Sequence, residues 1–198
     1  MGKRLDKILV IDVESTCWLD TPPPGEASEI IEIGLCLLDV STGRRDLKRS
    51  ILIRPERSAV SPFCTELTTL TQAQVNQGVS FAHACTILQE EYASGQRVWA
   101  SYGDYDRRQF YRQCRAQKVS YPFGPSHINV KNLFALSRGL PQEINLVQAL
   151  KMQGWELEGT YHRGDDDAWN IARILAAVLC HARSPDDHCH DLEEDSWP

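Results

Sequence analysis

An acidic pair at the end of an apolar run is the first feature of this chain that could do chemistry. In the stretch KILVIDVESTCW, Asp12 and Glu14 stand two residues apart. Side chains alternate along a strand, so both lie on the face of Val10, about 7 Å from each other. Buried carboxylates need a compensating charge, and a hard cation such as Mg²⁺ supplies it. The pair indicates a metal site, although a strand that simply runs out into a polar loop looks the same.

A third acidic candidate follows the short strand-like run RVWAS at residues 97–101. Asp104 comes three residues after this run. In α/β domains, functional side chains gather at the carboxyl ends of strands, which favours a role for Asp104 in the same site. The alternative is that Asp104 is only the N-cap of the next helix, a role for which Asp106 competes.

The segment YHRGDDDAWNIARIL contains the last group of candidates. A period of 3.6 residues aligns Asp167 with the apolar stripe of its helix, so this carboxylate is expected to point toward the core. Asp165 and Asp166 are expected to cap the helix and to complement its dipole. His162 precedes the helix on a loop that can fold back beside Asp167.

The elements that must position these residues can be predicted from the apolar patterning. Strands are expected at 6–14, 30–40, 47–55 and 97–101, with a fifth at the start of 127–137, which then becomes a helix. Further helices are expected at 69–78, 80–95, 106–118, 143–154 and 166–183. The polar turn STGRRD makes the first three strands an antiparallel meander. Helices and strands then alternate, which predicts a three-layer α/β domain with a five-stranded mixed sheet.

Composition limits the class of protein. The chain has 198 residues, 42% of them hydrophobic, which suits one domain over residues 1–183. Six acids and no Lys or Arg fall in 184–198, so this segment is expected to be a disordered acidic tail on a neutral body. No signal peptide or membrane span is expected. Seven Cys without framework spacing are typical of reduced thiols in a cytoplasmic protein.

Taken together, these segments resemble the DEDDh 3′–5′ exonucleases, which have a ribonuclease-H-like fold, and most of all their Eri1-type and KapD-like branch. The resemblance spans about residues 7 to 182 through VIDVESTC, EIIEIG, RPERSAVSPFCTELTTLTQAQV, YGDYDRRQF and HRGDDDAWNIARIL, in the family's order. The chain departs from the family pattern at Asp165, where an apolar residue is expected, and at Trp18 with the insert TPPPGEAS.

The resemblance implies a function and a set of residues. It implies hydrolysis of single-stranded RNA or DNA from a free 3′ end, with release of nucleoside 5′-monophosphates and two Mg²⁺ ions that Mn²⁺ can replace. The metal ligands would be the four carboxylates Asp12, Glu14, Asp104 and Asp167. His162 would be the general base, and Glu14 would act with it in catalysis.

Contacts to the nucleic acid are expected from five residues: Ser15, Thr16, Trp18, Leu70 and Arg108. Backbone N–H groups around Ser15 and Thr16 would bind the terminal 3′-hydroxyl. Trp18 would stack on the terminal base or pack on the rim of the site. Leu70 would wedge beside the last nucleotide or pack at a helix start. Arg108 belongs to a basic helix face that would follow the phosphate backbone or be merely solvated.

Three rival interpretations stay open at this point. One is an oligoribonuclease-like or proofreading exonuclease, which substrate length would distinguish. Another is a nucleic-acid-binding module without activity, although all five expected side chains are present. The last is a structural α/β protein with acid-rich loops, which would bind no pair of divalent ions. RNA or DNA preference and the oligomeric state do not follow from the sequence.

Overall fold

Five strands form one mixed sheet in the computed structural model, which describes residues 3–183. The strands are β1 (Arg4–Ser15), β2 (Ile30–Asp39), β3 (Arg45–Leu52), β4 (Arg97–Ser101) and β5 (His127–Asn129), in the spatial order β3-β2-β1-β4-β5. The first three strands pair antiparallel, and β4 and β5 continue the sheet parallel to β1. The predicted meander and the mixed sheet are confirmed. The acidic segment expected at 184–198 lies outside the described residues.

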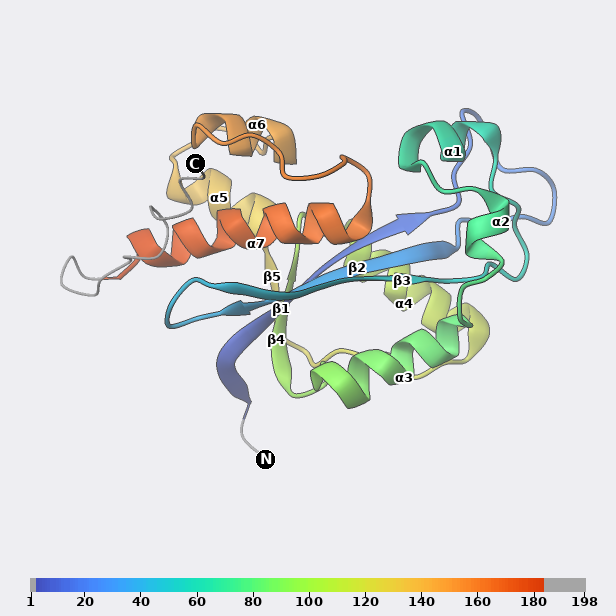
Figure 1. The fold of residues 1–198 in the computed structure, drawn as a ribbon, viewed down its shortest axis with the longest axis horizontal. Coiled ribbons are helices and arrows are strands. Elements are labelled where there is room, and N and C mark those ends of the chain that lie inside the picture. Colours follow the sequence, from blue (N-terminus) through green and yellow to red (C-terminus); the bar gives the residue numbers. More distant parts are fainter. Residues whose placement is uncertain (1–2, 184–198) are drawn as a thin grey trace.

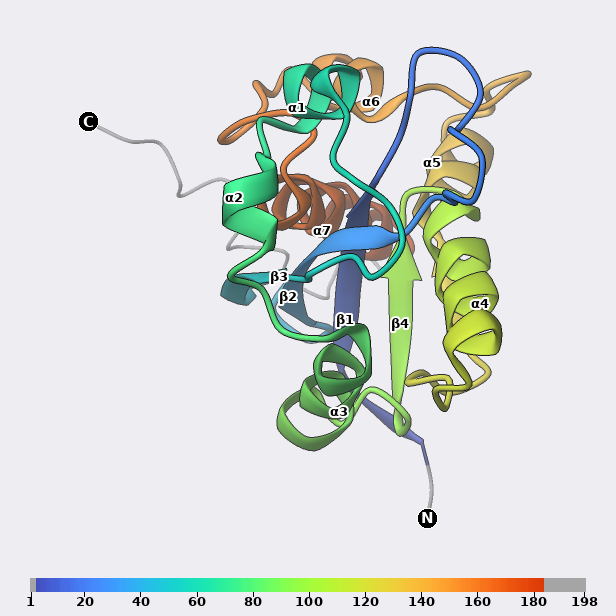
Figure 2. The ribbon, with the colours of Figure 1, turned by 90° about the vertical axis from the view of Figure 1, so that its right-hand side faces the viewer.

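Helices cover both faces of this sheet, as Figures 1 and 2 show. They are α1 (Pro62–Thr68), α2 (Gln72–Val75), α3 (Phe81–Tyr92), α4 (Tyr105–Gln117), α5 (Val130–Ser137), α6 (Leu146–Met152) and α7 (Gly164–His181). In Figure 1, α5, α6 and α7 lie on one face, whereas α3 and α4 lie on the other. The three-layer α/β prediction is therefore confirmed. Within residues 3–183, no helix combines the length and the apolarity that crossing a bilayer requires.

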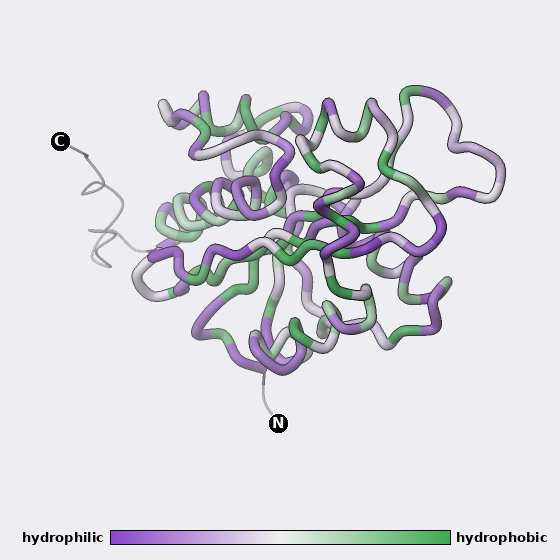
Figure 3. The backbone as a smooth tube through the Cα atoms, turned by 45° about the vertical axis from the view of Figure 1, so that its right-hand side comes forward, coloured by the Kyte–Doolittle hydropathy of each residue, from purple (hydrophilic) through white to green (hydrophobic). Residues whose placement is uncertain are grey.

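The alternation of side chains along β1 feeds two separate cores. Leu9 and Ile11 pack with Phe110 of α4, whereas Ile8 and Val10 pack with apolar residues of α7. Figure 3 shows hydrophobic stretches along the strands and helices, with hydrophilic stretches in many of the connecting turns. Because Asp12 and Glu14 follow Ile8 and Val10 at even spacing, they emerge on the α7 side of the sheet.

Two glycines let the start of α7 lie directly against the sheet. Gly34 of β2 pairs with Asp12 of β1, and a Cβ at Gly34 would lie 1.7 Å from the carbonyl carbon of Gly164. A Cβ at Gly164 would lie 2.8 Å from the Gly34 nitrogen. Only glycine, whose side chain is a single hydrogen atom, fits at both positions. The first turn of α7 therefore lies directly beside Asp12.

The region around residues 62–78 differs from its prediction. A helix was expected at 69–78 and none before it, but α1 covers Pro62–Thr68 and ends at Thr69, which adopts a left-handed conformation with φ 63°. The expected helix is reduced to the four residues of α2. The chain restarts as α2 behind a capping box in which Thr71 and Gln74 bond each other's backbone N–H groups. The left-handed residue is what divides the region into two short helices.

Candidate active site

Four carboxylates line one cavity of about 290 Å³ at the end of β1. They come from three elements: Asp12 and Glu14 from β1, Asp106 from the first turn of α4, and Asp167 from the first turn of α7. His162 lines the same cavity from the loop before α7. Ligand atoms of Glu14, His162 and Asp167 all lie within 4.8 Å of one another, close enough to share one ion.

The structure corrects the prediction for Asp104. Its side chain is 35% exposed, its carboxylate lies 3.7 Å from Arg107 Nε, and it does not line the cavity. Asp106 is buried there instead, and its carboxylate accepts a hydrogen bond of 3.0 Å from the backbone N–H of Val13. Asp104 is the N-cap residue immediately before α4 and makes no side-chain capping bond, whereas Asp106, in the first turn, faces β1.

The loop before α7 holds His162 in a strained conformation. Its φ is 62°, a region that residues with a side chain rarely occupy. The backbone N–H of His162 donates to Asp167 Oδ2 at 2.9 Å, and its ring lies 3.9 Å from the ring of Tyr161, centroid to centroid. This hydrogen bond fixes the position of His162 relative to the first turn of α7, as the sequence spacing predicted.

Glu32 of β2 anchors this loop and was not singled out in the sequence. Its side chain is fully buried and accepts hydrogen bonds from the Gly164 N–H at 2.8 Å and from an Arg163 guanidinium nitrogen at 2.9 Å. The Ser50 hydroxyl donates to it as well, at 2.5 Å. Glu32 therefore satisfies the first free N–H of α7, the role expected of acidic residues in the helix itself.

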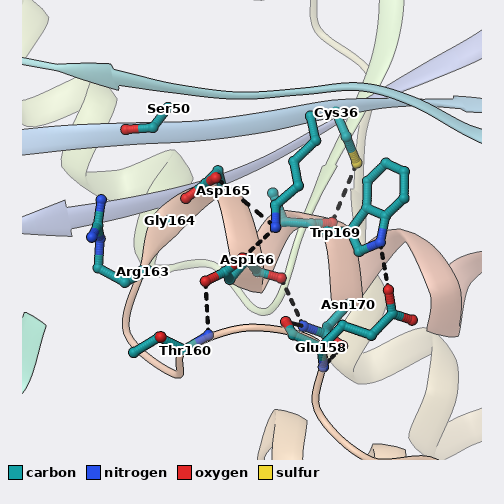
Figure 4. A network of polar contacts seen from close by, with 12 residues as sticks. Cys36, Ser50, Glu158, Thr160, Arg163, Gly164, Asp165, Asp166, Trp169 and Asn170 are labelled. Atoms are coloured by element: carbon teal, nitrogen blue, oxygen red, sulfur yellow. Dashed lines mark hydrogen bonds and ion pairs between the residues drawn. The ribbon is translucent and has the colours of Figure 1, made fainter.

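The remaining acids of the DDD run make other contacts, shown in Figure 4. Asp166 accepts a hydrogen bond of 2.7 Å from the Thr160 N–H and pairs with Lys48 of β3. Asp165 lies 4.0 Å from the same Lys48 amine. Neither residue caps the helix through a hydrogen bond to its N–H groups, so this part of the prediction is wrong. They instead tie α7 to the sheet edge and to the preceding loop.

Burial raises the pKa of all four carboxylates, and repulsion by neighbouring acids adds to it for Asp12, Glu14 and Asp167. Burial, followed by the charge of Asp167, raises the pKa of Glu14 to about 9. Burial likewise raises the pKa of Asp167 to about 7 and that of Asp106 to about 6. The pKa of Asp12 is raised well above its ordinary value, by burial first and then by Asp106. Such a group of acids is unfavourable unless a cation neutralises it.

The donor set fits a hard divalent cation. Among the described residues that line the cavity there is no Lys or Arg. Asp167 Oδ1 is buried and no donor of the described chain reaches it, although nearly all buried polar atoms have a partner. Carboxylate oxygens are the ligands that Mg²⁺ and Mn²⁺ prefer. The cavity can therefore hold such ions with Asp12, Glu14, Asp106 and Asp167.

The residues expected to contact substrate are only partly brought to the cavity. Ser15 lines it, with a buried hydroxyl that has no hydrogen-bond partner among the described residues. Thr16 does not, because its N–H donates to the Glu29 carbonyl and its side chain is fully buried. Leu70 is also fully buried, packed in a small core beside α1, so the packing alternative holds for it. Leu67, 37% exposed, lines the cavity instead.

The two other expected contacts lie outside this lining. Trp18 is half-buried on the loop after β1, and it is not among the residues that form the cavity. Arg108 is exposed on α4 and lines a different cavity. Three tyrosines that the sequence analysis did not select, Tyr102, Tyr105 and Tyr161, do line the carboxylate cavity.

Comparison with known proteins gives a consistent match. The family model described as Exonuclease (RNase_T) matches residues 9–175. The 3′-5′ exoribonuclease 1 of Homo sapiens is 30% identical over 184 residues, covering 88% of this chain and 52% of the relative. The ERI1 exoribonuclease 2 of Danio rerio is 41% identical over 200 residues, covering 89% of this chain and 36% of the relative.

One solved structure has the same fold as this chain over almost the whole length of both. The nuclease domain of 3′hExo, a DEDDh family member bound to rAMP, superposes with a TM-score of 0.81 at 28% identity. The match covers 91% of this chain and 95% of that domain. The chain spans only about half the length, or less, of the two full-length relatives above.

Proposed function

This chain belongs to the exonuclease family whose model matches residues 9–175, and from that premise we propose that it is a metal-dependent 3′–5′ exonuclease. It would remove nucleoside 5′-monophosphates from the 3′ end of single-stranded nucleic acid, with RNA as the favoured substrate because the full-length relatives above are named exoribonucleases. The observation that carries the proposal is the convergence of four carboxylates and His162 on one cavity.

We assign the metal ligands from the cavity rather than from the sequence spacing. Asp12, Glu14, Asp106 and Asp167 would hold two Mg²⁺ ions, for which Mn²⁺ can substitute, and Asp106 replaces Asp104 in this role. Two such ions supply charge at the attacking water and at the leaving 3′ oxygen. The orphaned Oδ1 atom of Asp167 supports this assignment, because an ion gives that buried oxygen its missing partner.

His162 is the proposed general base. A base must be neutral to take a proton from water, and burial lowers the pKa of the His162 imidazole below its ordinary value. Its backbone bond to Asp167 Oδ2 places the ring at the wall of the cavity, beside Tyr161. Glu14, whose carboxylate lies within 4.8 Å of a ring nitrogen of His162, would orient the same water.

The rim of the cavity would recognise the terminal nucleotide. Ser15 offers an unpartnered hydroxyl, and Leu67 and Tyr161 offer exposed apolar surface. Stacking of Trp18 on the terminal base stays a prediction. Residues 1–183 would act as one domain. A cytoplasmic location also stays a proposal, supported by free thiols at Cys36, Cys64 and other buried positions.

Digestion of end-labelled oligonucleotides tests the proposal. Single-stranded RNA and DNA, labelled at the 5′ end, are incubated with the protein with and without Mg²⁺. We expect a ladder that shortens from the 3′ end, faster on RNA, and no ladder in EDTA or with the Asp12→Ala variant. Products cut internally, or an Asp12→Ala variant with wild-type turnover, would contradict the proposed function.

A further inference from the structure

A second cavity, of about 490 Å³, lies between α4, the segment that follows it and the strands β4 and β5, and shares no lining residue with the carboxylate cavity. Its volume falls in the range of pockets that hold small ligands. The residues of its wall that matter here are Trp99, Arg107, Arg108, Tyr111, Tyr121 and His127. Figure 2 shows α4 running along the outside of β4, the strand that carries Trp99.

The wall of this cavity combines a rigid aromatic floor with one exposed ring. Trp99 is almost fully buried and is held between Phe123 and His127, each with its ring centroid 4.2 Å away. Tyr111, in contrast, is 64% exposed and meets Tyr121 edge to face, at 6.3 Å between centroids. An exposed tyrosine face beside a fixed aromatic floor is suited to a planar ligand that can stack.

The charge around the cavity is positive. The exposed arginines Arg107 and Arg108 of α4 line it, whereas Arg112 and Arg115 of the same helix lie outside its lining. The one acid of the helix, Asp106, is buried on the opposite side. Within the part of the chain that the structure describes, no carboxylate pairs with Arg108, and no acid lines the cavity. A stacking ligand that enters here would therefore also be favoured by a negative charge.

The two cavities are neighbours along α4. Tyr105 lines the carboxylate cavity and Arg108 lines the second one. Residues three apart lie on the same side of a helix, about 4.5 Å from each other along its axis. A chain whose end occupies the first cavity can thus reach the second by passing over the start of α4.

We propose that the second cavity binds an upstream, unpaired nucleotide of the same strand whose 3′ end occupies the carboxylate cavity. The base stacks on Tyr111 and its phosphate pairs with Arg108. This inference rests on the proposed function, and it adds a subsite that makes turnover depend on substrate length. A strand of several nucleotides fills both cavities, whereas a mononucleotide ester fills only the first.

Turnover of two substrates tests the subsite. One is a single-stranded RNA of about twelve nucleotides. The other is thymidine 5′-p-nitrophenyl phosphate, which is too short to reach the second cavity. For Tyr111→Ala and Arg108→Ala we expect KM for the long substrate to rise about tenfold, with kcat and turnover of the ester unchanged. The control is Arg115→Ala, which removes the same charge from α4 outside the cavity lining and should change KM less than about twofold.

A binding measurement keeps this inference separate from the proposed function. Fluorescence anisotropy of the labelled RNA in EDTA needs no catalysis. We expect Tyr111→Ala to weaken binding about tenfold and Arg115→Ala to leave it nearly unchanged. If wild type hydrolyses neither substrate but this difference is found, the subsite stands and the exonuclease proposal fails. If the Tyr111 variant binds and degrades the long RNA as wild type does, or if Arg115→Ala loses as much, the subsite is refuted.

Discussion

Replacing Gly34 by alanine should separate the two halves of the active site. Gly34 lies in β2 opposite Asp12, and the added Cβ would stand 1.7 Å from the Gly164 carbonyl carbon and 2.1 Å from the Asp165 nitrogen. Both are backbone atoms of α7, so no side-chain rotation can relieve the overlap. Restoring an ordinary contact of 3.4 Å requires the start of α7 to move by about 1.7 Å.

The movement should affect both stability and catalysis. Overfilling a packed core costs about 1–3 kcal/mol, and here we expect the upper end, since only backbone can yield. For a domain of this size, about 3 kcal/mol lowers Tm by roughly 6–12 °C. The same shift moves Asp167 and His162 away from Asp12 and Glu14. A misplacement of about 1 Å can reduce turnover about 100-fold, so kcat should fall at least that much.

Thermal unfolding and turnover of end-labelled RNA in Mg²⁺ measure both effects. The matched control is Gly95→Ala, where the nearest atom to the added Cβ is 3.9 Å away and φ does not require glycine. That variant should keep the Tm and turnover of wild type. A Gly34→Ala protein with wild-type Tm and kcat would show that the close approach of α7 to β2 does not position the site.

Three further outcomes follow from the same geometry. Because the folded-state pKa values of Glu14 and Asp167 are raised to about 9 and about 7, the metal-free protein keeps protons that the unfolded chain loses above about pH 4. The stability of the metal-free protein should therefore be greatest at low pH and fall as pH rises toward 9. The Tm measured in EDTA should decrease from pH 5 to 9, and an increase would contradict the raised pKa values. His162→Ala should lower kcat about 10²–10⁴-fold with Mn²⁺ affinity nearly unchanged, and wild-type kcat should fall in acid as the imidazole charges; equal turnover would remove the base assignment. Glu32→Ala should lower the free energy of unfolding, measured in urea, by about 3 kcal/mol, because the buried donors around it lose their acceptor. The control Glu91→Ala removes an exposed ion pair and should lower it by less than about 1 kcal/mol. Equal losses in the two variants would contradict the anchoring role of Glu32.

The periodic patterns of the sequence were sufficient for the fold and for most of the site. Alternation placed Asp12 and Glu14 on one face of β1 with Val10, and α7 covers that face. Helical periodicity placed Asp167 with Ile171 and Ile174, and these three residues are buried. These predictions succeeded because each rests on many apolar residues that must share one face. Helix α1 escaped prediction because its seven residues hold too few apolar positions to show a helical period.

The sequence prediction selected Asp104 where the structure has Asp106, and this error has a different cause. The two residues stand at the start of α4, where a shift of the helix boundary by one or two residues decides which carboxylate faces the sheet. The period that selected Asp167 would also have selected Asp106, since it lines up with the buried Phe110 and Gln113. Glu32, by contrast, could not be found this way, because Arg163 and Gly164, the partners that define its role, lie more than 130 residues away in the chain.

Calorimetric titration of Mn²⁺ tests most directly whether the carboxylates of β1, α4 and α7 form one metal site. Wild type should bind two ions. Asp106→Asn should weaken the binding of at least one ion by about tenfold or more, and Asp104→Asn should leave both affinities within about twofold of wild type. Loss of binding in the Asp104 variant with full binding in the Asp106 variant, or a wild-type protein that binds no Mn²⁺, would contradict the site as the structure arranges it.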